Sequence, residues 1–255
     1  LMGVIYISVA FILTIMHINL VPGVLGRIFA EAFDFSAIFG GFAGSCMMFG
    51  IKRGLYSNEA GVGSAPNAAA AADVSHPVKQ GLVQMLSVFI DTLLICTATA
   101  FMCLSSGIEP TKELAGAPYV QAALAASMGD YAKLFITVSM VLFAFTTLLG
   151  NLYYVDNAFA YVLKHVPGKT FTLCYRVLAC VLIFIGAGSS MGTMWDLADV
   201  TMGFMAIINL PVICILGGPA LRALDDYTEQ RDAGKNPEFK ASKIGLTQKL
   251  DYWQD

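Results

Sequence analysis

The sequence predicts an all-helical integral membrane protein. Hydrophobic residues make up 57% of the 255 residues, charged residues make up only 13%, and the mean hydropathy is +0.69. A soluble domain carries about 25% charged residues. The apolar runs are continuous and do not alternate, which favours membrane helices over the strands of a barrel. The chain is therefore expected to cross a bilayer several times.

Six stretches are long and apolar enough to span a membrane, which requires about 20 residues. They cover residues 2–21, 25–55, 79–106, 131–163, 171–189 and 194–221. Pro22-Gly23 is expected to stop the first span, and glycines interrupt the second. The stretch 107–130 is expected to hold a short interfacial helix.

The basic residues predict which side each loop faces. With six crossings, 12 of the 15 lysines and arginines fall on the side that also holds the C-terminus. Only Arg27, Lys112 and Lys133 fall on the other side. Cytoplasmic loops are enriched in lysine and arginine, so this side is expected to be the cytoplasm. Residues 1–222 then form a transmembrane domain of the cell membrane, and residues 223–255 form a polar cytoplasmic tail.

A glycine-rich motif, FGGFAGS, interrupts the second span at residues 39–45. Each glycine destabilises a helix by about 1 kcal/mol relative to alanine. Gly40 and Gly44 have the small-xxx-small spacing that allows two membrane helices to pack closely. The same glycines could instead mark an unwound segment whose backbone binds a solute. The residues leave both interpretations open.

A second polar motif, SNEAGVGSAP, covers residues 57–66. It lacks the GxxxxGKS or GxxxxGKT pattern of a phosphate-binding loop. Ser64 is expected to cap a helix that begins at Pro66 and continues through the alanines. Asn58 and Glu59 are either solvated at the cytoplasmic mouth or part of a gate.

Adjacent threonines, Thr146 and Thr147, lie in the middle of the fourth span. A threonine hydroxyl in a helix commonly bonds a carbonyl three or four residues earlier. Alternatively, hydroxyl oxygens can bind sodium, because hard cations prefer oxygen ligands. Sequence alone favours neither interpretation.

Asp91 lies deep in the third span, where a carboxylate must be paired, protonated or hydrated. A structural hydrogen-bonding role is favoured, and a role in binding a coupling ion is the alternative. Asn209-Leu210-Pro211 marks an expected kink in the sixth span.

Other chemistry finds little support in the residues. The six cysteines lie in or beside apolar runs without a CxxC pair, as expected of small buried residues, and the three histidines are scattered. No metal-binding cluster is predicted apart from a sodium site. The chain also lacks a convincing catalytic nucleophile and base, and a basic-aromatic face for nucleic acid. An enzyme and a nucleic-acid-binding protein are therefore not expected, and neither is an organic cofactor.

Three stretches resemble the alanine or glycine:cation symporters, the sodium:alanine symporter family. They are GIKRGLYSNEAGVGSAPNAAAAADVSHPVKQGLVQMLSVFIDTLLICTATA, FAFTTLLGNLYY and MWDLADVTMGFMAIINLP. The resemblance covers most of residues 1–222 and matches the C-terminal half of such transporters. It implies a LeuT-like fold of inverted repeats, with about six transmembrane helices here, one of them broken. The chain starts inside an apolar run without a signal peptide, so an N-terminal half is expected to be missing and to act as a partner.

The resemblance also implies a function and a set of sites. The function is symport of sodium with alanine or glycine by alternating access. The unwound interpretation of the broken helix is then favoured, with the substrate near Gly40, Gly41, Phe42, Gly44 and Ser45. Sodium would bind Thr146 and Thr147, and Asn58 and Glu59 would contribute to the cytoplasmic gate. A proton-coupled carrier that uses Asp91 is the main alternative, followed by a channel or a membrane enzyme.

Overall fold

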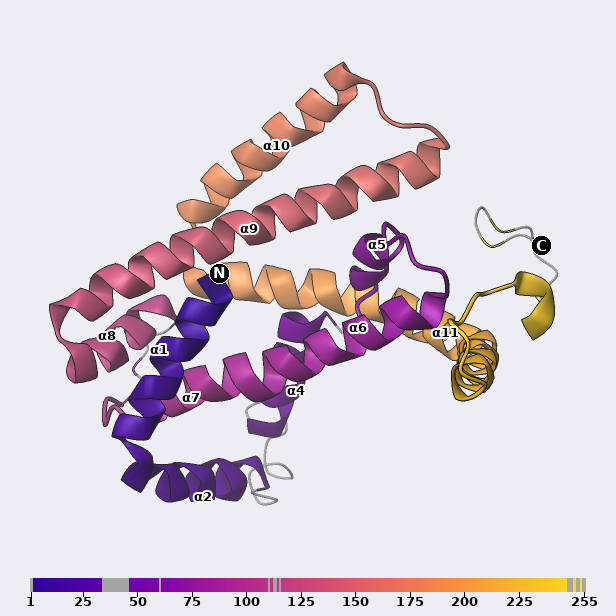
Figure 1. Cartoon of the computed structure of the whole chain (residues 1–255). Coiled ribbons are helices and arrows are strands. Elements are labelled where there is room, and N and C mark those ends of the chain that lie inside the picture. The colour runs from indigo at the N-terminus through magenta and orange to yellow at the C-terminus, as the bar shows by residue number, and fades with distance from the viewer. Residues whose placement is uncertain are drawn as a thin grey trace. The chain divides into compact units, whose positions relative to one another are not determined.

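The computed structural model describes residues 2–33, 46–59, 61–109, 111, 114, 116–246, 250 and 253. Every regular element among these residues is a helix, so the expected all-helical class is confirmed for this part of the chain (Figure 1). The chain divides into two compact units. One combines residues 1–58 with 89–152, and the other combines residues 59–88 with 153–255.

The first unit packs several helices around a small apolar core. Its helices are α1 (Met2–Met16), α2 (Val21–Ala32), α4 (Cys46–Asn58), α7 (Thr97–Leu104), α8 (Ala117–Met128) and most of α9 (Asp130–Leu163). Helix α7 packs against both α1 and α8. The buried core residues are Ala10, Leu13, Met102, Leu124, Ala132 and Ile136. The N-terminal helix is thus held by residues about 90 or more positions later in the sequence.

The N-terminal apolar stretch is bent, and this corrects the expected first span. Helix α1 ends at Met16, a 3-10 turn covers Ile18–Leu20, and α2 begins at Val21. The helices on either side of the break meet at 74°. The break lies at His17, whose ring Nδ1 is 3.0 Å from the carbonyl oxygen of Leu13.

Pro22 begins a helix here, so the expectation that Pro22-Gly23 stops the first one is wrong. Pro22 lies in the first turn of α2. A proline at that position costs no helical hydrogen bond, because the first N–H groups of a helix have no partner within it. The Pro22-Gly23 pair thus lies near a boundary between two helices, but the first helix ends earlier, at Met16, and the proline starts the second.

The second unit consists of long helices and a folded C-terminal segment. Its helices are α5 (Ala65–Ala69), most of α6 (Pro77–Ile90), the end of α9, α10 (Lys169–Ala187) and α11 (Met191–Asp232), followed by a 3-10 turn (Ala241–Ile244). The long helices expose apolar side chains, such as Phe184 at 82% exposure. Exposed apolar helix faces suit contact with lipid or with other membrane helices.

Four described helical stretches are long and apolar enough to cross a membrane. They are Pro77–Leu104, Asp130–Leu163, Lys169–Ala187 and Met191–Asp232, and the bent pair of residues 3–16 and 18–32 adds a fifth if it counts as one span. The four coincide with the last four of the six expected spans. The expected second span, 25–55, includes residues 34–45, which lie outside the described part of the chain.

The C-terminal segment folds back onto the start of α6. Helix α11 is uninterrupted at Pro211 and runs ten residues into the expected tail, to Asp232. Beyond it, the Phe239 N–H donates to the Ser75 carbonyl at 3.0 Å, and the Ser75 hydroxyl donates to the Pro237 carbonyl at 2.8 Å. The tail and the loop before α6 therefore lie at one end of this unit. The expectation that both lie on the cytoplasmic side of a membrane stays a prediction.

Candidate functional site

The predicted substrate-binding residues lie outside the described part of the structure. They are Gly40, Gly41, Phe42, Gly44 and Ser45. The chain is described again from Cys46, the first residue of α4. Both interpretations of the glycine motif therefore stay predictions.

The predicted sodium ligands, Thr146 and Thr147, lie in the middle of α9 and are exposed. The Thr146 hydroxyl donates to the carbonyls of Leu142 and Phe143, at 3.0 Å each. This is the local hydrogen bond that threonine commonly forms in helices. It uses the only hydroxyl proton and leaves the oxygen lone pairs as acceptors. The local bond and a cation site are thus compatible at this residue.

Asp91 forms a hydrogen bond at the start of an irregular part of the Pro77–Leu104 span. A π-helical stretch, Asp91–Cys96, separates α6 from α7. The Ser57 hydroxyl donates to Asp91 Oδ2 at 2.6 Å, and the Thr92 hydroxyl donates to Asn58 Oδ1 at 3.0 Å. Two consecutive residues at the end of α4 thus pair with two consecutive residues of the π-helical stretch. Such stretches often occur at functional sites.

Glu59 takes part in a tight turn. Its backbone φ is +51°, and Gly61 and Gly63 also have positive φ angles, +88° and +95°. The Ser64 hydroxyl donates to Glu59 Oε2 at 2.6 Å. The Glu59 carboxylate therefore stabilises the fold of its own segment, whatever part it plays in a gate.

Ser64 lies at the expected helix start but does not form the expected cap. Helix α5 begins at Ala65, one residue before the prediction, and Ser64 occupies its N-cap position without a capping hydrogen bond from its side chain. The prediction of the cap is wrong: the hydroxyl donates to the Glu59 carboxylate, and its oxygen accepts no N–H of the first helical turn. The Asn67 side chain donates to the Ser64 carbonyl at 3.1 Å.

Two asparagines of the long helices hold the segment that follows, which we call the small-residue loop (Gly61–Ala72). Asn209 Nδ2 of α11 donates to the Gly61 carbonyl at 3.0 Å. Asn157 Nδ2 of α9 donates to the Asn67 carbonyl at 3.1 Å. Asn209 was expected only as part of a kink, and no motif singles out Asn157. An amide side chain within a span needs a polar partner. That requirement could have identified both asparagines as residues with a structural role.

His76 is fully buried where the tail meets the start of α6. Its Nδ1 accepts the Val78 N–H at 3.2 Å, so the proton of the neutral ring lies on Nε2, 3.3 Å from Asp226 Oδ2. The rings of Tyr227 and Phe239 pack against it, with centroids 5.2 and 5.1 Å away. No sequence motif indicates this arrangement, because it joins residues about 150 positions apart.

We expect docking of the tail to weaken at acidic pH. Burial lowers the pKa of His76 below its usual 6.5, and Lys79 and Lys243 lower it further, whereas Asp226 opposes the shift. The docked tail therefore favours the neutral ring. Docking is at full strength above about pH 6.5 and is lost as the pH falls through the lowered pKa.

Hydrogen exchange of backbone amides in residues 236–246 at pH 5.5 and 7.5 measures this effect, after correction for intrinsic exchange rates. Exchange should be faster at pH 5.5. A His76→Gln variant removes the titrating ring, so its exchange should differ little between the two pH values. Equal protection of the unsubstituted protein at both pH values would contradict the expectation.

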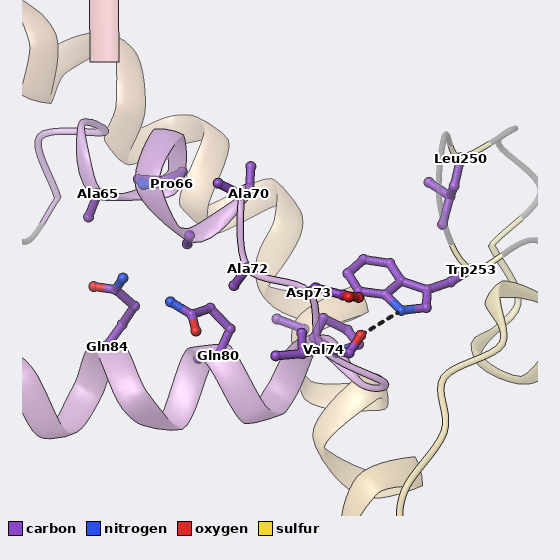
Figure 2. A pocket seen from close by; sticks show the side chains of 15 residues that line it. Ala65, Pro66, Ala70, Ala72, Asp73, Val74, Gln80, Gln84, Leu250 and Trp253 are labelled. Carbon is purple, nitrogen blue, oxygen red and sulfur yellow. Dashed lines mark hydrogen bonds between the residues drawn. The ribbon is translucent and has the colours of Figure 1, made fainter. Parts of the chain in front are cut away.

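An open pocket of about 1120 Å³ lies beside the small-residue loop. Figure 2 shows Gln80 and Gln84 pointing from α6 toward the loop, and Trp253 beside Asp73 and Val74. Trp253 Nε1 donates to the Val74 carbonyl at 3.3 Å. The pocket contains none of the predicted site residues. Within the described residues, no three or more His, Cys, Asp or Glu side chains are grouped so that they could hold a metal ion.

Comparison with known proteins gives one consistent result. The family model described as the sodium:alanine symporter family matches residues 1–241. The chain is 42% identical to the amino-acid carrier protein AlsT of Bacillus subtilis (strain 168) over 254 residues, which are 100% of this chain and 54% of AlsT. It is also 42% identical to the probable sodium/glutamine symporter GlnT of that organism over 252 residues, 99% of this chain and 52% of GlnT.

The name of a third relative includes the proton in addition to sodium. The sodium/proton-dependent alanine carrier protein of Bacillus sp. (strain PS3) is 38% identical over 268 residues, which cover 100% of this chain and 60% of the relative. The chain thus spans between 52% and 60% of the length of these three relatives. Their names differ in the amino acid and in the coupling ion.

Proposed function

Because the chain belongs to the sodium:alanine symporter family, a family of transporters and not of enzymes, we propose that it serves sodium-coupled symport of a small neutral amino acid, alanine or glycine. Transport would proceed by alternating access across the cell membrane, with the C-terminal tail in the cytoplasm. Coupling requires that sodium and the amino acid each raise the other's affinity by the same factor.

The geometry of Thr146 carries the sodium part of this proposal. A hard cation is bound by oxygen lone pairs, and a neutral hydroxyl supplies them without a charge. The local hydrogen bonds to Leu142 and Phe143 direct the hydroxyl proton toward the helix backbone. The lone pairs are then available on the outer side of the oxygen. Thr147, the next residue, would provide a second hydroxyl.

The substrate site is proposed from the sequence motif and from family membership. Gly40, Gly41 and Gly44 would allow the helix to unwind, and the freed backbone groups would bind the carboxylate and ammonium groups of the amino acid. Phe42 and Ser45 would line the same site. Asn58, Glu59 and Asp91 would stabilise or gate the pathway through the hydrogen bonds described above.

Proton coupling is the second candidate. The observation that favours it is the Asp91 carboxylate, which lies within a candidate span and accepts a hydrogen bond from Ser57. A carboxylate in such a place can exchange protons during transport. The name of the relative from strain PS3 includes both ions.

Ion gradients imposed on proteoliposomes separate the two candidates. The protein, expressed from its complete gene, is expected to take up alanine or glycine at least tenfold faster under an inward sodium gradient at equal pH. A pH gradient without sodium should give no stimulation.

An Asp91→Asn variant is the matched control, since the amide retains an acceptor for Ser57 and cannot titrate. It should keep sodium-driven uptake. Uptake that follows the pH gradient alone and disappears in Asp91→Asn would replace sodium coupling with proton coupling.

A further inference from the structure

We propose that the small-residue loop is a plug, and that Asn209 and Asn157 are the positioning residues that hold it in place. The assignment of the plug to the cytoplasmic exit rests on the proposed function. The attachment of the loop to α9 and α11 is observed in the structure.

The position of Asn209 along α11 places the loop inside the membrane. Asn209 lies twelve residues before Leu221, where the apolar stretch 194–221 ends. At about 1.5 Å per residue, this distance is roughly 18 Å along the helix. The Gly61 carbonyl is bonded to Asn209, so the loop reaches that depth. It then runs to the tail end of the unit, where Ser75 is bonded to Phe239 and Pro237.

The polar groups of the loop are satisfied in the way that such a depth requires. Irregular backbone is tolerated at membrane depth only where protein or water satisfies its polar groups. The Gly61 and Asn67 carbonyls accept the amides of Asn209 and Asn157. The Ser64 carbonyl accepts both the backbone N–H and the side-chain amide of Asn67. The loop therefore does not depend on bulk water for these acceptors.

Close packing fixes the loop against α11. Gly63 has a φ of +95°, and a Cβ atom added to it would lie 2.9 Å from Asn209 Cγ. Only glycine leaves room for this approach. The neighbouring residue, Val62, is 4% exposed, although it belongs to a loop. A valine buried in an irregular segment indicates that the loop docks at a defined position.

The attachment is also weak enough to be reversible. Two neutral hydrogen bonds hold the loop to the long helices, and each stabilises a contact by about fivefold in equilibrium constant. Alternating access requires a closed state that opens during each cycle. The plug would leave its seat as the exit opens and return as the exit closes.

Thiol labelling of a Val62→Cys variant tests the proposal. The protein is expressed from its complete gene with its own cysteines replaced, and an impermeant maleimide is applied to the tail side of membrane vesicles. Val62→Cys should label slowly, because the residue is buried. Asn209→Ala, and separately Asn157→Ala, should each raise the labelling rate about fivefold, the effect of one lost hydrogen bond.

Two matched controls make the result specific to the loop. Thr201→Val removes a polar group from α11 whose hydrogen bonds, within the described residues, are to the Leu197 and Ala198 carbonyls, so it should leave labelling unchanged. Val166→Cys, at a residue 83% exposed between α9 and α10, should label rapidly in every background. A general folding defect would alter both labelled positions, whereas loss of positioning alters only Val62→Cys.

The outcomes of this test and of the transport assay are separable, because labelling requires no transported substrate. If Val62→Cys labels as fast as Val166→Cys, or if neither asparagine variant raises its labelling, the plug is refuted and sodium coupling is unaffected. If labelling behaves as expected but uptake does not respond to sodium, the plug stands and the proposed coupling ion is wrong.

Discussion

Replacing both Thr146 and Thr147 with valine is expected to abolish sodium-stimulated uptake while leaving the protein folded in the membrane. Valine has nearly the same shape as threonine but no oxygen, so each substitution removes one proposed sodium ligand. The hydroxyl proton of Thr146 is already used within the helix, and the oxygen lone pairs are the feature that is lost. Initial uptake rates as a function of sodium concentration measure the effect.

Thr201→Val is the matched control for this prediction. The Thr201 hydroxyl donates to the Leu197 and Ala198 carbonyls at 2.9 and 3.0 Å, nearly the same geometry as that of Thr146. Loss of a local threonine hydrogen bond alone should therefore reduce the uptake rate little, and Thr201→Val should retain sodium dependence. Thr146→Ser keeps the oxygen and should also retain it. Unchanged sodium dependence in the double valine variant would reject the ion site.

The long spans could be predicted from the sequence because their signal is local and continuous. About 20 apolar residues in a row form a helix in lipid whatever lies elsewhere in the chain. The predicted stretches 131–163 and 171–189 therefore agree within two residues with Asp130–Leu163 and Lys169–Ala187. The bend at His17 was missed because no glycine or proline adjoins the break, which lies within the expected span 2–21.

The polar contacts could be predicted only in part, because their partners are distant in sequence. The position of Ser64 at a helix start follows from its neighbours, but its hydrogen bond to Glu59 depends on the turn between the two residues. Asn209 and Gly61 are 148 positions apart, and Ser75 and Pro237 are 162 apart. No periodicity or motif relates such pairs. A buried amide in a span predicts that a partner exists, but not which one.

Gly63→Ala is expected to displace the small-residue loop more strongly than removal of either asparagine. A left-handed backbone costs about 1–2 kcal/mol for a residue other than glycine. The added methyl group would also overlap Asn209, and such overpacking costs about 1–3 kcal/mol. A total of about 3 kcal/mol corresponds to a change of roughly a hundredfold in the docking equilibrium. Labelling of Val62→Cys and the rate of amino-acid uptake both report on this change.

Gly234→Ala separates backbone strain from the lost contact. Gly234 also has a positive φ, +73°, but an added Cβ would meet nothing within 4 Å. This variant should destabilise the protein only through backbone strain, and it should leave the small-residue loop in its docked position.

The decisive comparison combines Gly63→Ala with Asn209→Ala. Removing the Asn209 side chain removes the overlap, so Gly63→Ala should cost less in that background than in the unsubstituted protein. Coupling of this kind is expected only for residues in contact. Strictly additive effects would show that Gly63 and Asn209 act independently, and the close approach of the loop to α11 would then have no part in holding the exit closed.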